Sequence, residues 1–301
     1  MSNNTNKVTA TINELREELL NKYAFTIFDL KVDAASDDGK IAISGEILTA
    51  KQLSLLKRRL TDLSNDITVE YSINIITSDE NIRRISNYGE VAKGSIVDVS
   101  SDFIGNKLAT QISLCDKPFK IILNNEGKTL ISLSDYTIGW VDDSAIVPLD
   151  RSDFDYWANI KRLKKDGLVE VSSLLPIFYE SAPFIDMAEY LHGGRSDEAV
   201  DCSALMQLLF LSAYDIVLPR HSLDQMKCGI RIPKGDIASG DLVFARRKGT
   251  RIMHVGLAFY HEKMFVIHSC LREKLVIRED INSFFEHYTF AGAKRMIKES
   301  A

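Results

Sequence analysis

A cysteine stands directly after an aspartate and directly before an apolar run, in the stretch Asp201-Cys202-Ser203-Ala204-Leu205. The Asp201 carboxylate can accept a backbone N–H of a first helical turn, so we expect a helix over residues 202–214. A thiol at a helix start meets unpaired N–H groups and the positive end of the helix dipole, which favour the thiolate and lower the thiol pKa. Cys202 is therefore a candidate nucleophile for covalent catalysis.

Two histidines occupy neighbouring strand-like runs, His254 at the start of residues 254–260 and His268 within residues 265–269. A hairpin centred on His261 places them directly opposite each other, on one face of a sheet. A turn that differs by one residue sends them to opposite faces. Because a thiol nucleophile needs a base that can later protonate a leaving amine, the pairing favours a catalytic role for these imidazoles over a structural one.

The elements that must position these groups form an α+β pattern from about residue 172 onward. Helices precede an antiparallel set of strands, which is typical of an α+β domain. The predicted helices and strands are residues 174–184, 202–214, 241–245, 254–260, 265–269, 275–278 and 290–296. The expected division of the chain is 1–79, 80–150, 151–171 and 172–301, and the basic run 161–165 in the third segment is expected to be a solvated connector.

Two smaller units precede this domain. Residues 8–76 have the order helix, strand, strand, helix, strand, with a turn at 36–39. This order and the stretch Ile43-Ser-Gly-Glu46 resemble the BON domain of bacterial envelope proteins, which implies a small α/β unit for binding or spacing. Residues 80–150 have five short strands, near 94–99, 107–112, 119–124, 129–133 and 139–141, at the spacing of a small β barrel. Residues 108–112, 118–122 and 139–141 resemble a bacterial Src-homology-3 barrel, and a generic barrel without a ligand is the alternative.

The C-terminal motifs, taken in order, resemble the NlpC/P60 family of bacterial cell-wall cysteine peptidases. The resemblance spans residues 172–297 and is carried by 190–195, 201–203, 218–222 with Gln225, 240–244, 254–256 and 267–269. It implies a papain-like fold with Cys202 as nucleophile, His254 as general base and acid, and His268 as the residue that orients His254. It also implies hydrolysis of the γ-D-glutamyl bond to a diamino acid in peptidoglycan stem peptides through a thioester, with no metal or organic cofactor.

The same resemblance implies a set of substrate-binding residues. They are Tyr136, Tyr190, Asp201, Ser203, Arg220 and Ser222. Relatives with such a barrel use it to close one end of the cleft and so select stems with a free N-terminal amine, such as L-Ala-γ-D-Glu-diaminopimelate. The acidic barrel residue that binds this amine falls on Lys107 here, and the aromatic one falls on Thr137, beside Tyr136. Asp201 or Asp102 could still hold the amine, or the enzyme could accept a blocked N-terminus.

The family pattern is not matched everywhere around the nucleophile. His192 stands where the family usually has Trp, and Ala204 stands where it usually has Gly. The loop of residues 196–200 lacks the Gly that usually precedes the Asp-Cys pair. These departures leave the nucleophile intact and change the expected pocket wall.

Composition restricts the function classes further. The chain has 301 residues, is 45% apolar and carries a net charge of −5, which excludes wholesale disorder and argues against a nucleic-acid partner. No apolar run reaches the ~18 residues of a membrane span, and the polar start lacks the pattern of a secretory signal. We therefore expect a cytoplasmic protein, with export by a route without a cleavable signal as the alternative.

Three other functions stay open at this point, as does the oligomeric state. The four cysteines at 115, 202, 228 and 270 are too sparse for a disulfide framework. Cys202, His254, His268 and Cys270 could instead bind a metal, although their spacing is not that of a zinc site. The protein could also bind wall peptides without cleaving them, or it could transfer the acyl group with the same residues.

Overall fold

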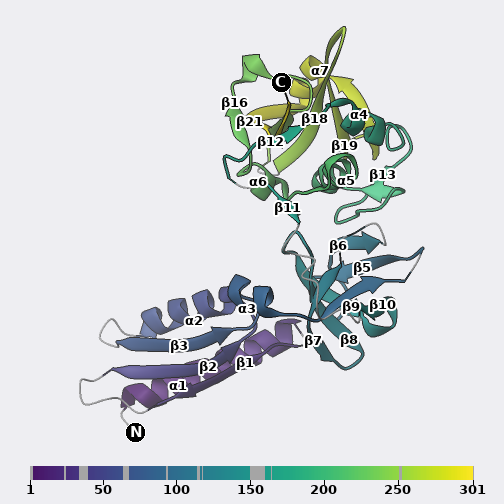
Figure 1. Ribbon diagram of the computed structural model, residues 1–301. Coiled ribbons are helices and arrows are strands. Elements are labelled where there is room, and N and C mark those ends of the chain that lie inside the picture. The colour runs from purple at the N-terminus through teal and green to yellow at the C-terminus, as the bar shows by residue number, and fades with distance from the viewer. Residues whose placement is uncertain are drawn as a thin grey trace.

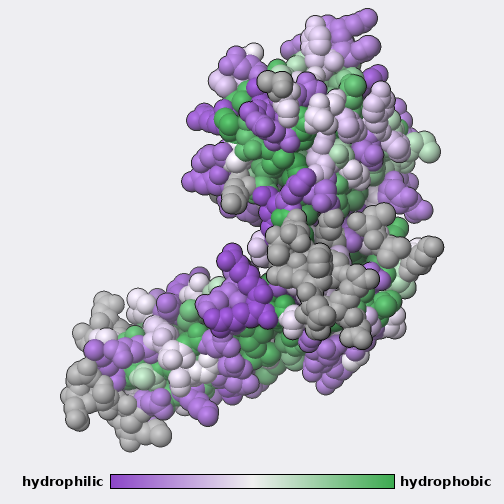
Figure 2. All heavy atoms as spheres, in the orientation of Figure 1, coloured by the Kyte–Doolittle hydropathy of each residue, from purple (hydrophilic) through white to green (hydrophobic). Residues whose placement is uncertain are grey.

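The computed structural model describes residues 3–23, 25–33, 40–63, 68–92, 94–113, 116, 118–149, 160–163, 165–250 and 253–300. Cys115, the predicted turn at 36–39 and the first part of the connector, 151–159, lie outside these residues. Figure 1 shows three successive units, with the N-terminal and C-terminal units at opposite ends and a β-rich unit between them. Figure 2 shows hydrophilic side chains spread over this face of the molecule, with hydrophobic atoms visible between them. No helix in the described part of the chain is both long and apolar enough to cross a membrane.

The N-terminal unit has the predicted order of elements. These are α1 (Asn3–Tyr23), β1 (Phe28–Val32), β2 (Ile41–Ile47), α2 (Ala50–Leu63) and β3 (Val69–Ile75). Strand β2 lies in the centre, antiparallel to β1 and parallel to β3. Helices α1 and α2 contact each other, and their apolar stripes form the core of this unit with residues such as Leu15, Leu56 and Ile43. The likeness to a BON domain stays a prediction.

The middle unit follows the short helix α3 (Asp79–Arg84) and is an antiparallel sheet of strand order β10-β4-β7-β8-β9-β5-β6. Five strands correspond to predicted ones: β5 (Ile96–Ser100), β6 (Leu108–Ser113), β7 (Phe119–Asn125), β8 (Lys128–Ser132) and β9 (Ile138–Asp142). The pair β4 (Tyr88–Val91) and β10 (Ile146–Leu149) was not predicted, because Gly89 and Pro148 disfavour strands and only the pairing across the sheet stabilises them. A short 3-10 turn, Asp143–Ala145, precedes β10. The Src-homology-3 assignment of this unit stays a prediction.

The C-terminal unit has the predicted α+β fold, with an eight-stranded sheet of order β14-β13-β20-β19-β18-β17-β21-β16. Its strands in that sheet are β13 (Glu189–Tyr190), β14 (Ala199–Val200), β16 (Ile230–Ile232), β17 (Leu242–Arg247), β18 (Met253–His261), β19 (Lys263–Cys270), β20 (Leu275–Asp280) and β21 (Tyr288–Arg295). Its helices are α4 (Leu175–Ser181), α5 (Cys202–Tyr214), α6 (Ser222–Gln225) and α7 (Ile281–His287). Lys234–Asp236 forms a 3-10 turn after β16.

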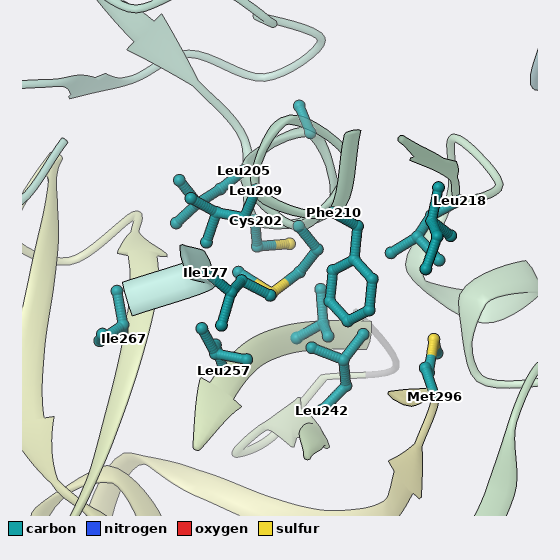
Figure 3. Close-up of a cluster of buried hydrophobic side chains, with 14 of the residues drawn as sticks. Ile177, Cys202, Leu205, Leu209, Phe210, Leu218, Leu242, Leu257, Ile267 and Met296 are labelled. Carbon is teal, nitrogen blue, oxygen red and sulfur yellow. The ribbon is translucent and has the colours of Figure 1, made fainter. Parts of the chain in front are cut away.

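Helix α5 packs against β18 and β19 and forms the centre of the C-terminal core. Figure 3 shows Cys202 among these buried side chains, which include Leu209, Phe210 and Leu257. Burial of each such leucine contributes roughly 1.5–3 kcal/mol to the stability of the folded state. The residue predicted as nucleophile is thus held by the buried core of this unit.

The segment that was expected to be a solvated connector is packed into the C-terminal unit where it is described. Strand β11 (Lys161–Arg162) pairs with β15 (Ile216–Val217), and β12 (Val169–Val171) pairs with β22 (Ile297–Glu299). Leu163 is buried in the C-terminal core, and Arg162 Nε donates to the Ser134 carbonyl at 2.8 Å. Lys161 and Lys165 are exposed, as expected of a solvated run, but the buried Leu163 between them packs into the C-terminal core.

Candidate active site

Helix α5 begins at Cys202 because Asp201 caps it. Asp201 Oδ1 accepts the backbone N–H of Ala204 at 2.8 Å, and the same carboxylate accepts the N–H of Gly193 at 3.0 Å. The cap was predicted from the sequence and is confirmed. The thiol therefore stands on the first turn, where its side chain faces β18.

The pKa of Cys202 departs in the opposite direction from the predicted one. Burial, and next the Asp201 carboxylate, raise the pKa to about 12, although hydrogen bonds from the backbone N–H groups of Val255 and Ser203 lower it in part. The sequence prediction considered the helix start alone, but Cys202 is only 9% exposed, so the desolvation of a thiolate outweighs the helix effect. The sulfur is therefore a neutral thiol near neutral pH, and it could act as a nucleophile only if a neighbouring base took its proton.

The histidines lie on one face of the β18–β19 hairpin, but not directly opposite each other. Leu257 pairs with Ile267 and His261 pairs with Lys263, so the hairpin is centred on Glu262 and not on His261. Continued by one residue, this register puts Gly256 opposite His268, with His254 two residues further along β18. A loop longer by one residue would move the partner by one and reverse its face, but a centre moved by one whole residue moves the partner by two. Both imidazoles therefore keep the same face.

The two rings are in direct contact. His254 Nε2 lies 2.8 Å from His268 Nδ1, and the ring planes are nearly perpendicular at 87°. Tyr288 of β21 stacks on the other side of His254, with centroids 4.6 Å apart and an interplanar angle of 7°. Burial, and next the neighbouring His268, hold the pKa of His254 well below its ordinary value. His254 is therefore a neutral imidazole at neutral pH, which is the form a general base requires.

His268 has a second partner that the sequence did not indicate. Its Nε2 lies 2.7 Å from Glu279 Oε1, on β20. Burial raises the pKa of Glu279, but the hydrogen bond from His268 and the charge of Arg272 outweigh it, so the pKa lies below its usual range. The predicted strand ended at residue 278, and nothing in the sequence distinguishes Glu279 from the nearby Glu273. The side-chain row is thus His254, His268 and Glu279 across three adjacent strands.

Tyr190 lies at the edge of the site on β13. Burial, and next the charges of Cys202 and Asp201, raise its pKa to about 12. Its hydroxyl is therefore protonated at neutral pH and can donate a hydrogen bond near the thiol.

A buried ion pair between Arg220 and Asp201 lies next to the thiol and connects this site to the middle unit. Arg220 Nη1 and Nη2 donate to the two Asp201 oxygens at 2.9 and 2.6 Å, and Nη1 also donates to Ser203 Oγ at 3.1 Å. Arg220 Nε donates to Thr110 Oγ1 of β6 at 3.0 Å. This fork places Arg220 between the helix that carries the thiol and the middle sheet.

A second arginine repeats this connection beside the first. Arg195 Nη1 pairs with Asp116 at 2.5 Å, and the backbone N–H of Arg195 donates to Gln111 Oε1 at 3.0 Å. Gln207 Nε2 of α5 donates to Asp135 Oδ2 at 2.6 Å. The middle unit is therefore held against the side of the C-terminal unit where α5 begins.

The other predicted substrate-binding residues lie in different surroundings. Ser222 is the buried first residue of α6, and Gln225 of the same helix donates to the Ser203 carbonyl at 2.9 Å. Tyr136 is 38% exposed with a left-handed φ of 67°, and the Arg162 guanidinium lies 4.9 Å from its ring centroid. Lys107 is exposed. The structure thus brings Tyr190, Asp201, Ser203 and Arg220 together, and their roles toward substrate stay predictions.

Metal binding was one of the open functions. Among the residues that the structure describes, no three or more His, Cys, Asp or Glu side chains are grouped so that they could hold a metal ion. The hydrogen-bonded row of His254, His268 and Glu279 instead resembles a general base with its orienting partners in a nucleophilic site.

Comparison with known proteins identifies the C-terminal unit. The model of the NlpC/P60 family matches residues 187–294. A probable endopeptidase of Haemophilus influenzae is 32% identical over 132 residues, which cover 44% of this chain and 78% of the relative. The chain belongs to the NlpC/P60 family. The probable endopeptidase NlpC of Escherichia coli is 31% identical over 108 residues, or 36% of this chain and 68% of the relative.

Another relative matches a longer stretch of this chain than the family model does. The γ-D-glutamyl-L-lysine dipeptidyl-peptidase of Bacillus subtilis is 29% identical over 155 residues, which cover 48% of this chain and 49% of that protein. The chain thus spans about half the length of this relative. The family match itself begins at residue 187, so it concerns the C-terminal unit.

The NlpC/P60 motif His254-Val-Gly256 has a packing reason in this chain. A Cβ on Gly256 would lie 2.5 Å from Val266 Cγ1 and 3.0 Å from His268 Cβ. We expect Gly256→Ala to push His268 out of line and to lower the free energy of unfolding by about 1–3 kcal/mol, as overpacking does. Activity should fall with it.

Urea unfolding and peptidase assays measure both effects of Gly256→Ala. Gly235→Ala is the matched control, because nothing lies within 4 Å of a Cβ at that position. Equal stability and activity of the two variants would show that Gly256 does not set the position of His268.

Proposed function

We propose that this protein is a cysteine peptidase that hydrolyses the γ-D-glutamyl bond to a diamino acid in peptidoglycan stem peptides. One observation carries the proposal: the Cys202 thiol, at the start of α5, is hydrogen-bonded to the backbone N–H of Val255, the residue that follows His254. The nucleophile and the base thus come from packed elements that meet at this point. The names of the relatives support a wall-peptide substrate, since they include endopeptidases and a γ-D-glutamyl-L-lysine dipeptidyl-peptidase.

The reaction begins when His254 takes the proton of the neutral Cys202 thiol and the sulfur attacks the γ-carbonyl carbon. The oxyanion that forms accepts hydrogen bonds from backbone N–H groups at the helix start, including that of Cys202. Each such donor stabilises the transition state by roughly 3 kcal/mol. The intermediate collapses with cleavage of the C–N bond, and the imidazolium of His254 gives its proton to the leaving amine. A thioester remains on Cys202.

Water completes the cycle. His254, again neutral, takes a proton from water as the oxygen attacks the thioester carbonyl, and the C–S bond breaks. The proton returns to the sulfur, and the D-glutamyl γ-carboxylate is released. If an amine attacked the thioester in place of water, the same residues would transfer the acyl group to that amine. Product analysis therefore separates hydrolysis from transfer.

Selection of the free N-terminal amine is the finer part of the proposal. The carboxylates that could hold an ammonium are already bonded: Asp201 to Arg220, and Asp102 Oδ1 to the N–H groups of Gly105 and Asn106 at 2.8 and 3.0 Å. Lys107 supplies a charge of the same sign as the amine, which is unfavourable. We propose that the middle unit selects free stems by closing the cleft sterically, without a charge pair.

Paired substrates test this selection. L-Ala-γ-D-Glu-diaminopimelate should be cleaved about 10-fold faster than its N-acetyl form, because the acetyl group meets the closed end of the cleft. Chromatography with mass detection measures both rates under the same conditions. Equal rates, or faster cleavage of the acetylated peptide, would contradict selection for free stems.

The place of the protein in the cell stays a prediction.

A further inference from the structure

Glu279 lies in line with the two histidines because of strand register. His268 pairs with Ile277 across β19 and β20, so Glu279, two residues further, has its side chain on the same face. The carboxylate Oε1 is 2.7 Å from His268 Nε2, and the two side chains are 13% and 0% exposed. A charged hydrogen bond in so little water is strong and directional.

An ionised carboxylate can only accept hydrogen bonds, so the proton between Glu279 and His268 resides on His268 Nε2. In the neutral imidazole, Nδ1 of His268 must then be an acceptor. The 2.8 Å contact from His254 Nε2 to this Nδ1 requires that His254 carry its proton on Nε2. The lone pair of His254 is left on Nδ1, the nitrogen that remains for the thiol.

We infer that Glu279 is a positioning residue that fixes the tautomers of His268 and, through it, of His254. A histidine in the orienting position can either donate or accept, so His268 by itself does not decide which nitrogen of His254 is the base. In the alternative state, His268 Nδ1–H would donate to His254 Nε2, and the proton on His254 Nδ1 would block removal of the thiol proton. The carboxylate excludes this state, and its negative charge also stabilises the imidazolium that forms during acylation.

The surroundings of Glu279 supply a matched control. Arg272 Nη2 lies 3.4 Å from Glu279 Oε2, and Arg272 Nε donates to Glu273 Oε1 at 2.6 Å. Glu273 therefore shares the same arginine, while its side chain is 50% exposed. Glu273→Gln makes the same chemical change next to the same cation, but leaves the hydrogen bond to His268 in place.

The kinetic test rests on the proposed catalytic role of His254. Glu279→Gln and Glu279→Ala should lower kcat by about 10- to 100-fold, with KM changed less than about twofold, because substrate contacts remain. Glu279→Asp should recover part of the loss if it can reach His268, and Glu273→Gln should match the wild type. A kcat within about twofold of the wild type in both Glu279→Gln and Glu279→Ala would overturn the inference.

A spectroscopic test is independent of activity. In protein with nitrogen-15-labelled histidine, the His254 signals are assigned by their loss in His254→Ala. We expect Nε2 of wild-type His254 to be protonated and Nδ1 to be unprotonated, and we expect Glu279→Gln or Glu279→Ala to introduce the other tautomer. Unchanged His254 signals in the folded Glu279→Gln protein would contradict the positioning role even if activity fell. A shifted tautomer in a protein without peptidase activity would instead retain this inference and contradict the proposed function.

Discussion

Replacing Cys202 with alanine should lower kcat/KM by about 10⁴-fold or more while the protein still folds, since loss of a covalent nucleophile removes the whole acyl-transfer route. Helix α5 should still begin at residue 202 in this variant, because its N-cap depends on the Asp201 carboxylate and not on the thiol. Alanine also keeps the Cβ that packs in the C-terminal core. Peptidase assays together with circular dichroism measure the two properties separately.

Cys228→Ala is the matched control for this substitution. Its thiol donates to the Leu163 and Asp224 carbonyls at 3.6 Å each, and neither residue belongs to the proposed site. Activity of this variant should stay within about twofold of the wild type, as is usual for substitutions away from a site. Full activity in Cys202→Ala, or equal losses in both variants, would refute Cys202 as the nucleophile.

Removal of His254 should have an effect of similar size. His254→Ala leaves the neutral thiol of Cys202 without a base, and because the Cys202 pKa is raised to about 12, spontaneous ionisation cannot compensate near neutral pH. We expect kcat to fall by about 10³-fold or more in the same assay. Retention of even one tenth of the activity would show that another group takes the proton.

The pH profile of the wild type tests the same assignment without a substitution. The pKa of His254 is depressed by burial and by His268, so the base is neutral, and active, above that lowered pKa. The rate should therefore be lost only as pH falls well below about 6.5, the ordinary histidine value. No second rise is expected near pH ~8.5, where a free cysteine ionises, because the Cys202 thiol stays neutral there. A rise near that pH would contradict attack by a neutral thiol assisted by a base.

The sequence predicted the parts of the site that depend on local interactions. The Asp201 cap and the bounds of α5 follow from side-chain chemistry within one turn, and both are observed. The shared face of His254 and His268 follows from strand alternation, which tolerates a hairpin centre displaced from His261 to Glu262. The α+β class of the C-terminal unit was likewise predictable from the order of its elements.

The features that the sequence analysis predicted wrongly or missed depend on neighbours that are distant in sequence. The raised pKa of Cys202 comes from burial by strands of the sheet, which no local motif encodes. Glu279 becomes a partner of His268 only through the register of β19 and β20. Strands β4 and β10 contain residues that disfavour extended structure, and they pair because the rest of the middle sheet brings them together.

The most direct measurement of the central claim is product analysis in heavy-oxygen water. Wild-type protein and Cys202→Ala are incubated with L-Ala-γ-D-Glu-diaminopimelate, and the products are identified by mass spectrometry. Hydrolysis through a thioester predicts free diaminopimelate and L-Ala-D-Glu with a single heavy oxygen in the γ-carboxylate, from the wild type alone. Cleavage at another bond, no cleavage by the wild type, or the same products from Cys202→Ala would contradict the account.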